Sequence, residues 1–490
     1  MRVLLLLPAL LFACEPSKVQ LGGDDTAGTG DNGGDSNGGD SNGGDSNGGD
    51  TSDTSDTSDT GETGDPGDVV LTDLSWRLHE EIQSFVYAAW TQSGPGSVHV
   101  EYSFDDGEWA SSPSINGVTG ANEQLIVGIP YATNAAWRVV VDGGPSADGP
   151  TITSGPQPNG LPLGEVTVSE PDQWIEGGNY MLTSINERGG GWTGGTYWAF
   201  IIDRQGRVIW AKKTGGSHWT LYTQVAVSGD HILVDESTYW SEWDEGRDSV
   251  IHSRYLDQEI EVIDTPGLHH EFVQLPDGTL VWGSQYHDGT EALVEMAPGE
   301  TEQTILWTCD DDWPGSGRDC ESNGLWYEES TDTFLYSFYT NNSLVEVDHQ
   351  SGESLWWAGD VDNGFDFDPP TSQFSWQHGV SFTNEGHLLV STEWPYNSRD
   401  QTTWVAEYEV DRTAGALHYV WGSDSDIYAS TNGDALRYDN GNTLHVVGAA
   451  GVIREINPAG EDIWRVDFHD DKLLGKGNFI ADLYPLLAPR

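Results

Sequence analysis

The stretch "GLHHEFVQLPDGTLVWG", residues 267–283, has the pattern of a β-hairpin. Two short apolar runs flank "LPDGT", whose Pro, Asp and Gly are typical of a tight turn. Similar stretches are "TQVAVSGDHILVD" (223–235), "GVSFTNEGHLLVS" (379–391) and "DALRYDNGNTLHVV" (434–447). We therefore predict several short hairpins of one kind along the second half of the chain.

A second kind of hairpin alternates with the first. Its members are "FIIDRQGRVIW" (200–210), "SRYLDQEIEVI" (253–263), "LVEMAPGETEQTILW" (293–307), "LVEVDHQSGESLWW" (344–357), "VAEYEVDRTAGALHYVW" (405–421) and "VIREINPAGEDIW" (452–464). Two hairpins per unit make four strands, and a period near 50 residues is typical of a propeller blade. The repeat predicts an all-β six-bladed β-propeller over 165–490, closed by a strand from "NFIADLYPLL" (478–487) or "NYMLTSI" (179–185).

Residues 69–160 alternate apolar and polar side chains between Gly, Asp and Asn turns, as in "SVHVEYSFDDGEW" (97–109). This pattern predicts antiparallel strands with one buried face. The passage "GIPYATNAAWRVVVD" (128–142) resembles the end of a fibronectin type III or immunoglobulin-like module. We therefore expect a small β-sandwich ahead of the propeller.

The chain starts with an apolar run that ends in "LFAC" (11–14), which resembles the lipobox of bacterial lipoproteins. The resemblance implies that residues 1–14 are a signal peptide and that Cys14 carries the lipid anchor. Glu15 follows, which favours an outer-membrane lipoprotein facing the periplasm or the cell surface. Residues 15–68 are rich in Gly, Ser, Asp and Thr, a composition that predicts a disordered acidic tether.

Only two other cysteines exist, Cys309 and Cys320, at the ends of a loop rich in Asp and Gly. In an exported protein this spacing predicts a disulfide. The net charge is −60 at pH 7, and most of the acidic residues lie outside the tether. Such a charge argues against nucleic acid or an anionic lipid surface as a partner.

Three histidines are the candidate catalytic residues. His269 and His270 precede the predicted first strand of one blade, and His378 in "FSWQHGVSF" precedes that of another. Residues at this position converge on the central channel of a propeller. We predict that His269, His270 and His378 meet there and line a ligand site.

The stretches "HHEFVQLPDGTLV", "FSWQHGVSF" and "GDALRYDNGNTLHV" together resemble the bacterial arylsulfotransferases. The resemblance implies transfer of a sulfuryl group from an aryl sulfate to a phenol, through a histidine in the channel and without a nucleotide or other required cofactor. His270, or His269, matches one histidine of the family, and His378 matches another. A neutral imidazole can act as nucleophile, and a second imidazole can move the proton.

Two positions depart from the family pattern. Glu393 in "STEW" stands where the family has an arginine, and Asn432 stands where the family has its nucleophilic histidine. An amide cannot carry a sulfuryl group, so another histidine takes that role or the activity is lost. The alternative is a non-catalytic propeller that holds a glycan or a phenolic compound.

The sequence also contains one candidate calcium loop. In "DVDNGFDFD" (360–368), Asp360, Asp362 and Asp366 could supply oxygen ligands to a structural Ca²⁺, although a solvated loop has the same composition. Motifs of serine hydrolases, zinc peptidases and P-loop nucleotidases are absent from the sequence.

Overall fold

The computed structural model of the chain describes residues 68–105, 107–188, 196–214, 219–237, 249–287, 290–313, 320–396, 398–469 and 472–490. The predicted signal peptide, Cys14 and the predicted tether to residue 67 lie outside these ranges. Within them, no helix has the length and apolar character that crossing a membrane requires.

Two sheets form the first part of the described chain. One contains β1 (Leu71–Leu78), β2 (Val86–Gln92) and β6 (Gly120–Ile126), and the other contains β3 (Gly96–Phe104), β4 (Ala110–Ser111), β5 (Ile115–Gly117), β7 (Asn134–Val141), β8 (Ser146–Asp148) and β9 (Ile152–Thr153). Side chains of β2, β3 and β7 alternate between buried and less buried positions, as the sequence pattern predicted. Trp90 of β2 and Trp137 of β7 belong to one shared core.

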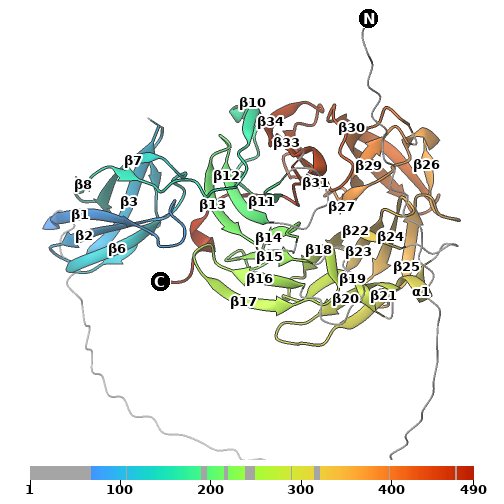
Figure 1. Cartoon of the computed structure of the whole chain (residues 1–490), viewed down its shortest axis with the longest axis horizontal. Coiled ribbons are helices and arrows are strands. Elements are labelled where there is room, and N and C mark those ends of the chain that lie inside the picture. The colour runs from blue at the N-terminus through green and yellow to red at the C-terminus, as the bar shows by residue number, and fades with distance from the viewer. Residues whose placement is uncertain are drawn as a thin grey trace, which may run out of the picture. The chain divides into compact units, whose positions relative to one another are not determined.

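Six further sheets make up the rest of the described chain (Figure 1). From the first strand outward, the first sheet contains β14 (Thr223–Val225), β15 (Ile232–Glu236), β16 (Val250–Arg254) and β17 (Glu259–Asp264), and the second contains β18 (Leu268–Gln274), β19 (Leu280–His287), β20 (Thr290–Met296) and β21 (Thr304–Thr308). The third contains β22 (Ser322–Glu328), β23 (Thr333–Phe338), β24 (Ser343–Asp348) and β25 (Ser354–Ala358), and the fourth contains β27 (His378–Phe382), β28 (Leu388–Trp394), β29 (Thr402–Asp411), β30 (Ala416–Asp424) and β26 (Asp366–Asp368). The fifth contains β31 (Asp434–Arg437), β32 (Thr443–Val447), β33 (Val452–Ile456), β34 (Asp462–Asp467) and β10 (Glu165–Ser169), and the sixth contains β35 (Asn478–Ile480), β11 (Tyr180–Asn186), β12 (Tyr197–Asp203) and β13 (Val208–Lys213).

Helical segments are few and short. They are α1 (Cys309–Asp312) and the 3₁₀ turns η2 (Pro171–Gln173), η3 (Pro370–Ser372), η4 (Gly448–Ala450) and η5 (Tyr484–Leu486). Cys309 at the start of α1 is bonded to Cys320, just before β22, with the Cα atoms 6.2 Å apart. The bond ties the third of these sheets to the helix that leads into it.

The predicted hairpins coincide with strand pairs of these sheets, but the sequence pattern missed the pair β22–β23. In three recognised hairpins the turn contains a glycine with positive φ, namely Gly278 (φ 92°), Gly386 (φ 78°) and Gly441 (φ 86°). In the turn between β22 and β23, Asp332 takes that conformation at φ 54°. Because Asp tolerates the left-handed region, the turn needs no glycine, and the usual sequence signal is absent.

The two segments predicted to close the repeat pair with each other. β35 is antiparallel to β11, with Tyr180 opposite Ile480 and Leu182 opposite Asn478. The C-terminal segment therefore supplies the first strand of a sheet whose other strands come from the start of the repeat. Two outer strands were not expected: β10 adds to β34, and β26 adds in parallel to β30.

Burial differs strongly between inner and outer strands of these sheets. All residues of β12, β23 and β27 are buried, whereas most of β17 is exposed. The first strands β18, β22, β27 and β31 are neighbours in that order, and Figure 1 shows them gathered toward the middle of the group of sheets. The described chain thus has an all-β, propeller-like fold.

Candidate functional site

The two adjacent histidines lie inside β18, not ahead of it as the sequence suggested. The pairing of β18 with β19 shifts between Leu268 and Phe272, and this irregularity contains both residues. His270 has φ 55°, and the exposed fractions of His269 and His270 are 1% and 2%. Both side chains therefore lie in the packed interior, at an irregularity of the strand pair.

A chain of hydrogen bonds links Glu291 of β20 to both histidines. His269 Nε2 lies 3.1 Å from Glu291 Oε1, and His269 Nδ1 lies 2.9 Å from His270 Nδ1. Ser322 Oγ and the Tyr336 hydroxyl also donate to Glu291 Oε1, which fixes it as an acceptor. His269 consequently donates from Nε2 and accepts at Nδ1. In neutral His270 the proton therefore lies on Nδ1, and Nε2 carries a lone pair.

His378 is the first residue of β27, and its exposed fraction is 6%. Its Nδ1 donates to the carbonyl of Trp376 at 3.0 Å, so the neutral ring likewise has an unprotonated Nε2. Burial lowers the pKa of His378 to about 4. Burial, and then the nearby rings of His269 and His378, hold the pKa of His270 well below its usual value. Both candidate bases are therefore neutral at pH 7.

Next to the histidines, three charged groups meet between the first strands. Lys476, just before β35, forms an ion pair with Glu271 of β18, and Asp434 of β31 interacts with the same ammonium. Burial raises the pKa of Glu271 to about 7, partly offset by Lys476, and burial also raises the pKa of Asp434. Burial acts to lower the pKa of Lys476, but the two carboxylates outweigh it and raise that pKa.

Two glycines make room for this charged cluster. A Cβ on Gly324 of β22 would lie 3.5 Å from the Gly379 nitrogen and 3.8 Å from Glu271 Oε2. A Cβ on Gly379 of β27 would lie 2.4 Å from the Asp434 Cα, and its φ is 58°. The first strands of neighbouring sheets therefore approach so closely here that side chains fit at only some positions.

The two positions that depart from the family pattern are both buried. Asn432 has φ 56°, its Nδ2 donates to the Leu474 carbonyl at 3.2 Å, and its Oδ1 has no hydrogen-bond partner in the structure. Glu393 of β28 accepts a hydrogen bond from Thr403 Oγ1 at 3.1 Å, and its Oε2 also has no hydrogen-bond partner. Burial raises the pKa of Glu393 to about 7, so this carboxyl can carry a proton near neutrality.

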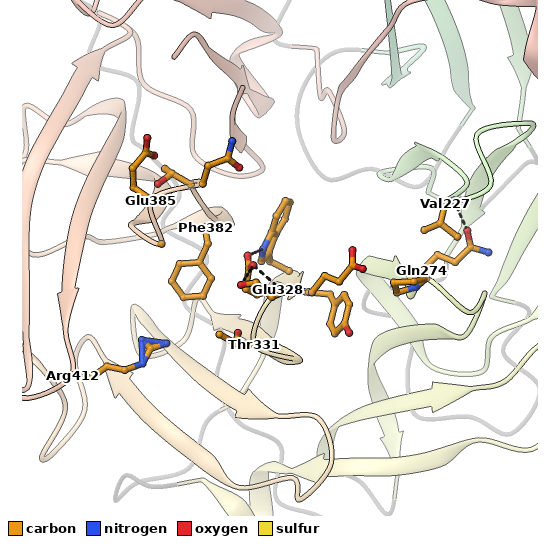
Figure 2. Close-up of a pocket in the computed structure, with 15 residues that line it drawn as sticks. Val227, Gln274, Glu328, Thr331, Phe382, Glu385 and Arg412 are labelled. Carbon is orange, nitrogen blue, oxygen red and sulfur yellow. Dashed lines mark hydrogen bonds between the residues drawn. The ribbon is translucent and has the colours of Figure 1, made fainter. Parts of the chain in front are cut away.

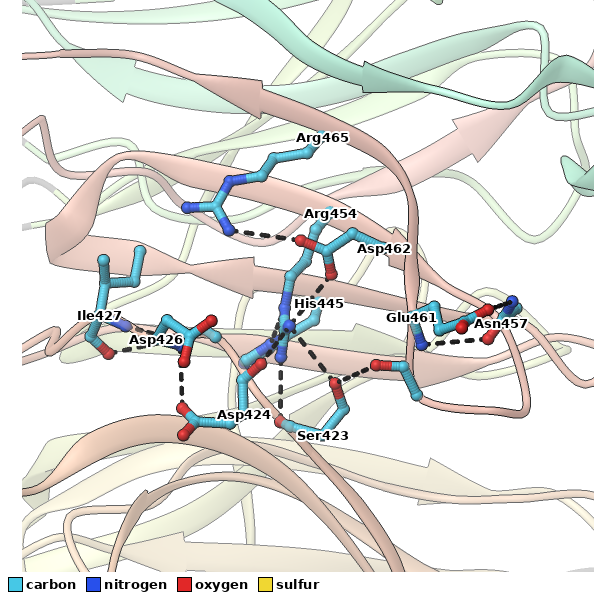
Figure 3. A network of polar contacts seen from close by, with 12 residues as sticks. Ser423, Asp424, Asp426, Ile427, His445, Arg454, Asn457, Glu461, Asp462 and Arg465 are labelled. Carbon is cyan, nitrogen blue, oxygen red and sulfur yellow. Dashed lines mark hydrogen bonds and ion pairs between the residues drawn. The ribbon is translucent and has the colours of Figure 1, made fainter.

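A Ser–His pair joins β28 and β32 of two neighbouring sheets, and Figure 3 shows its histidine, His445, beside Arg454. Ser391 Oγ is 3.1 Å from His445 Nε2, and Arg454 Nε donates to His445 Nδ1 at 3.0 Å. Because a guanidinium can only donate, neutral His445 carries its proton on Nε2 and donates it to Ser391. Burial, then Arg454, holds the pKa of His445 well below its usual value. This pair cannot activate the serine, and we interpret it as structural.

A cavity with a volume of about 1000 Å³ lies away from the histidines. It is lined by the ends of β18, β22 and β27 and the turns that follow, with Trp326, Tyr327 and Phe382 among its walls (Figure 2). His269, His270 and His378 stand at the starts of β18 and β27. The cavity and the histidines therefore occupy opposite ends of the same strands.

The calcium candidate Asp360 has other hydrogen-bond partners. Asp360 accepts from Asn342 Nδ2 at 2.8 Å, from Gln373 Nε2 at 2.7 Å and from the Tyr396 hydroxyl at 2.6 Å. Asp366 lies in the edge strand β26. Within the described ranges, no three His, Cys, Asp or Glu residues are grouped so that they could hold a metal ion.

Two charged residues beside the candidate histidines, Lys476 and Glu291, were not predicted from the sequence. Lys476 could have been found, because it precedes a segment proposed as the closing strand and the rule that selected the histidines applies to it. Glu291 had no signal, since it lies on the third strand of its sheet and reaches His269 only through folding.

The chain matches no known protein family by sequence, and no curated protein matches it. Solved structures resemble it at low identity. A streptogramin B lyase shares 12% identity with a TM-score of 0.38, covering 64% of this chain and 98% of that one. A protein of unknown function from Bacteroides caccae shares 12% with a TM-score of 0.40, covering 59% and 93%. A protein provisionally described as a 6-phosphogluconolactonase from Bacteroides fragilis shares 14% with a TM-score of 0.38, covering 78% and 98%. These scores carry no conclusion about activity.

Proposed function

We propose that this protein is a histidine-dependent aryl-sulfate sulfotransferase, with His270 as nucleophile and His378 as base. The observation that carries the proposal is the chain Glu291–His269–His270, in which every proton has an assigned place. A buried carboxylate behind two imidazoles orients His270 and stabilises positive charge on it. The motif resemblance to arylsulfotransferases supplies the reaction class.

The proposed reaction has two steps. His270 Nε2 attacks the sulfur of an aryl sulfate, the bond from sulfur to the aryl oxygen breaks, and the phenolate leaves. The Nδ1 proton of His270 is shared with His269, whose own Nε2 proton is bound to Glu291. In the second step His378 Nε2 takes the proton of the acceptor phenol, whose oxygen attacks the sulfur and releases His270.

The proposed substrate is an anion, so the site needs a positively charged group to bind it. Lys476 is paired with Glu271, the residue that follows His270, and it is the cation that we assign to this role. Burial raises the pKa of its partner Glu271, and Lys476 partly offsets this effect. Protonation of Glu271 would free the ammonium of Lys476 to receive a sulfuryl oxygen.

Turnover of 4-nitrophenyl sulfate with phenol as acceptor tests the proposal. We expect His270→Ala and His378→Ala to lower kcat/KM by about 10²-fold or more, and Glu291→Gln to lower it less. His418→Ala is the matched control, since His418 pairs with Asp368 on an outer strand. Peptide mapping after brief reaction should find the added sulfuryl mass on His270. Absence of turnover in the wild type, or equal loss in the control, refutes the proposal.

A second candidate function is ligand binding without catalysis, and the cavity of about 1000 Å³ favours it. Trp326, Tyr327 and Phe382 offer ring faces beside polar groups, which suits a glycan or a phenolic compound. Calorimetric titration with a cello-oligosaccharide and with 4-nitrophenol would test it. Phe382→Ala should weaken this binding and leave sulfate turnover unchanged.

We also propose the larger organisation of the chain. The six sheets of β10–β35 would be six blades of a propeller closed by β35 on β11, and the two sheets of β1–β9 a β-sandwich. Cys14 would carry lipid and hold the protein at the outer membrane through the acidic tether. Limited proteolysis should cut only within 21–68, and the intact mass of the mature protein should include the acyl chains.

A further inference from the structure

Trp376 is an exposed aromatic residue with an unusual backbone conformation. Its exposed fraction is 50%, and its φ is 49°. In the described ranges ten residues other than glycine have positive φ, and seven of these are Asn or Asp. The remaining three are Ala132, His270 and Trp376. The two bulky members of this group both belong to the neighbourhood of the candidate site.

Both backbone groups of Trp376 are held by side chains. Its N–H donates to Asn342 Oδ1 at 2.7 Å, and its carbonyl accepts from His378 Nδ1 at 3.0 Å. Asn342 in turn donates to Asp360, which also accepts from Gln373 and Tyr396. A continuous network therefore fixes Trp376 relative to the ring of His378.

Among the described residues, one aromatic side chain lies beside the ring of Trp376. Tyr339 lies nearly parallel to it, with centroids 6.4 Å apart and an interplanar angle of 18°. Half of the surface of Trp376 nevertheless stays in contact with solvent. A left-handed conformation costs free energy for any residue with a Cβ, and an exposed indole gains little from burial. Neither conformation nor packing therefore accounts for tryptophan at this position, and strain of this kind is typical of ligand sites.

We propose that Trp376, backed by Tyr339, is the surface on which the aromatic ring of a phenolic substrate stacks beside His378. The choice of a phenolic ring rests on the proposed function. Offset stacking of two rings is favourable, and the bond from His378 to the Trp376 carbonyl sets the distance between the stacked ring and the base. Trp376 is thus a specificity residue, and it takes no part in proton or sulfuryl transfer.

The test compares Trp376→Ala, Trp376→Phe and Trp376→Gly with Trp109→Ala as the matched control. Trp109 has an exposed fraction of 43% and lies in the N-terminal part of the described chain. Two readouts are used: calorimetric titration with 4-nitrophenol, and KM and kcat for 4-nitrophenyl sulfate. We expect Trp376→Ala to weaken phenol binding and raise KM about tenfold with kcat little changed, and Trp376→Phe to lie between.

Trp376→Gly separates recognition from a structural role, because glycine accepts the left-handed conformation. Its melting temperature should equal or exceed that of the wild type, while its affinity for 4-nitrophenol falls as in Trp376→Ala. Tryptophan-dependent binding without sulfate turnover would leave this inference intact and refute the proposed reaction. Binding by Trp376→Ala as tight as by Trp109→Ala, or no binding of 4-nitrophenol by the wild type, overturns the inference.

Discussion

Lys476 and Glu271 form a buried ion pair although they are 205 positions apart in the chain. Glu271 belongs to β18 and Lys476 to the segment that leads into the closing strand β35. Lys476 therefore reaches Glu271 from the segment that pairs with β11. The ion pair connects the strand pair β35–β11 to the neighbourhood of the candidate histidines.

Lys476→Met should destabilise the protein by about 3–5 kcal/mol, because Glu271 and Asp434 would be left buried without a cation. Denaturant unfolding measures this. Lys472→Met is the matched control, since Lys472 donates to a backbone carbonyl of Glu187, and it should cost much less. Adding Glu271→Gln to Lys476→Met should recover part of the loss. Equal losses in the two lysine variants would contradict this assignment.

Glu393 should make stability fall as the pH rises. Its folded pKa of about 7 lies above the usual value of 4.5, so its contribution is complete below about pH 4.5 and is lost as the pH rises through 7. The shift corresponds to about 3 kcal/mol. Relative to the wild type, Glu393→Gln should therefore gain stability between pH 4 and pH 8 in denaturant titrations. A difference that does not change with pH would refute the buried, protonated state.

Gly379→Ala should cost more than Gly386→Ala. Both glycines have positive φ, but a Cβ at Gly386 meets nothing within 4 Å, whereas one at Gly379 would meet Asp434 Cα. Gly386→Ala should cost about 1 kcal/mol for conformation alone, and Gly379→Ala about 1–3 kcal/mol more for the clash. Thermal unfolding measures both. Similar losses would show that β27 and β31 do not approach closely at this position.

Reduction of the bond between Cys309 and Cys320 should destabilise the protein by about 3 kcal/mol, the value expected for a loop of this size. Unfolding of the wild type with and without reductant measures the effect. The double variant Cys309→Ser, Cys320→Ser should match the reduced protein and be insensitive to reductant. Titration of free thiols in the native, unreduced protein should find none at these positions.

Much of the fold could be predicted from sequence because its signals are local. Alternating apolar residues and turns built on Gly278, Gly386 and Gly441 identify most hairpins, and their spacing predicts the repeat. The exception, β22–β23, has Asp332 in its turn and so lacks the glycine that marks the others. When a residue other than glycine adopts the left-handed backbone conformation of the turn, the hairpin lacks its usual sequence signal and is missed.

The candidate site depended more on tertiary structure. The sequence by itself identified His269, His270 and His378, because their place before predicted first strands follows from the repeat. Only folding decided that a bulge buries the histidine pair, that Glu291 orients it, and that Lys476 supplies the cation. These contacts join positions far apart in the chain, and no local pattern encodes a distance between different sheets. Burial then sets the protonation of Glu393 and His378, since a pKa depends on the surrounding dielectric and charges, which exist only in the folded state.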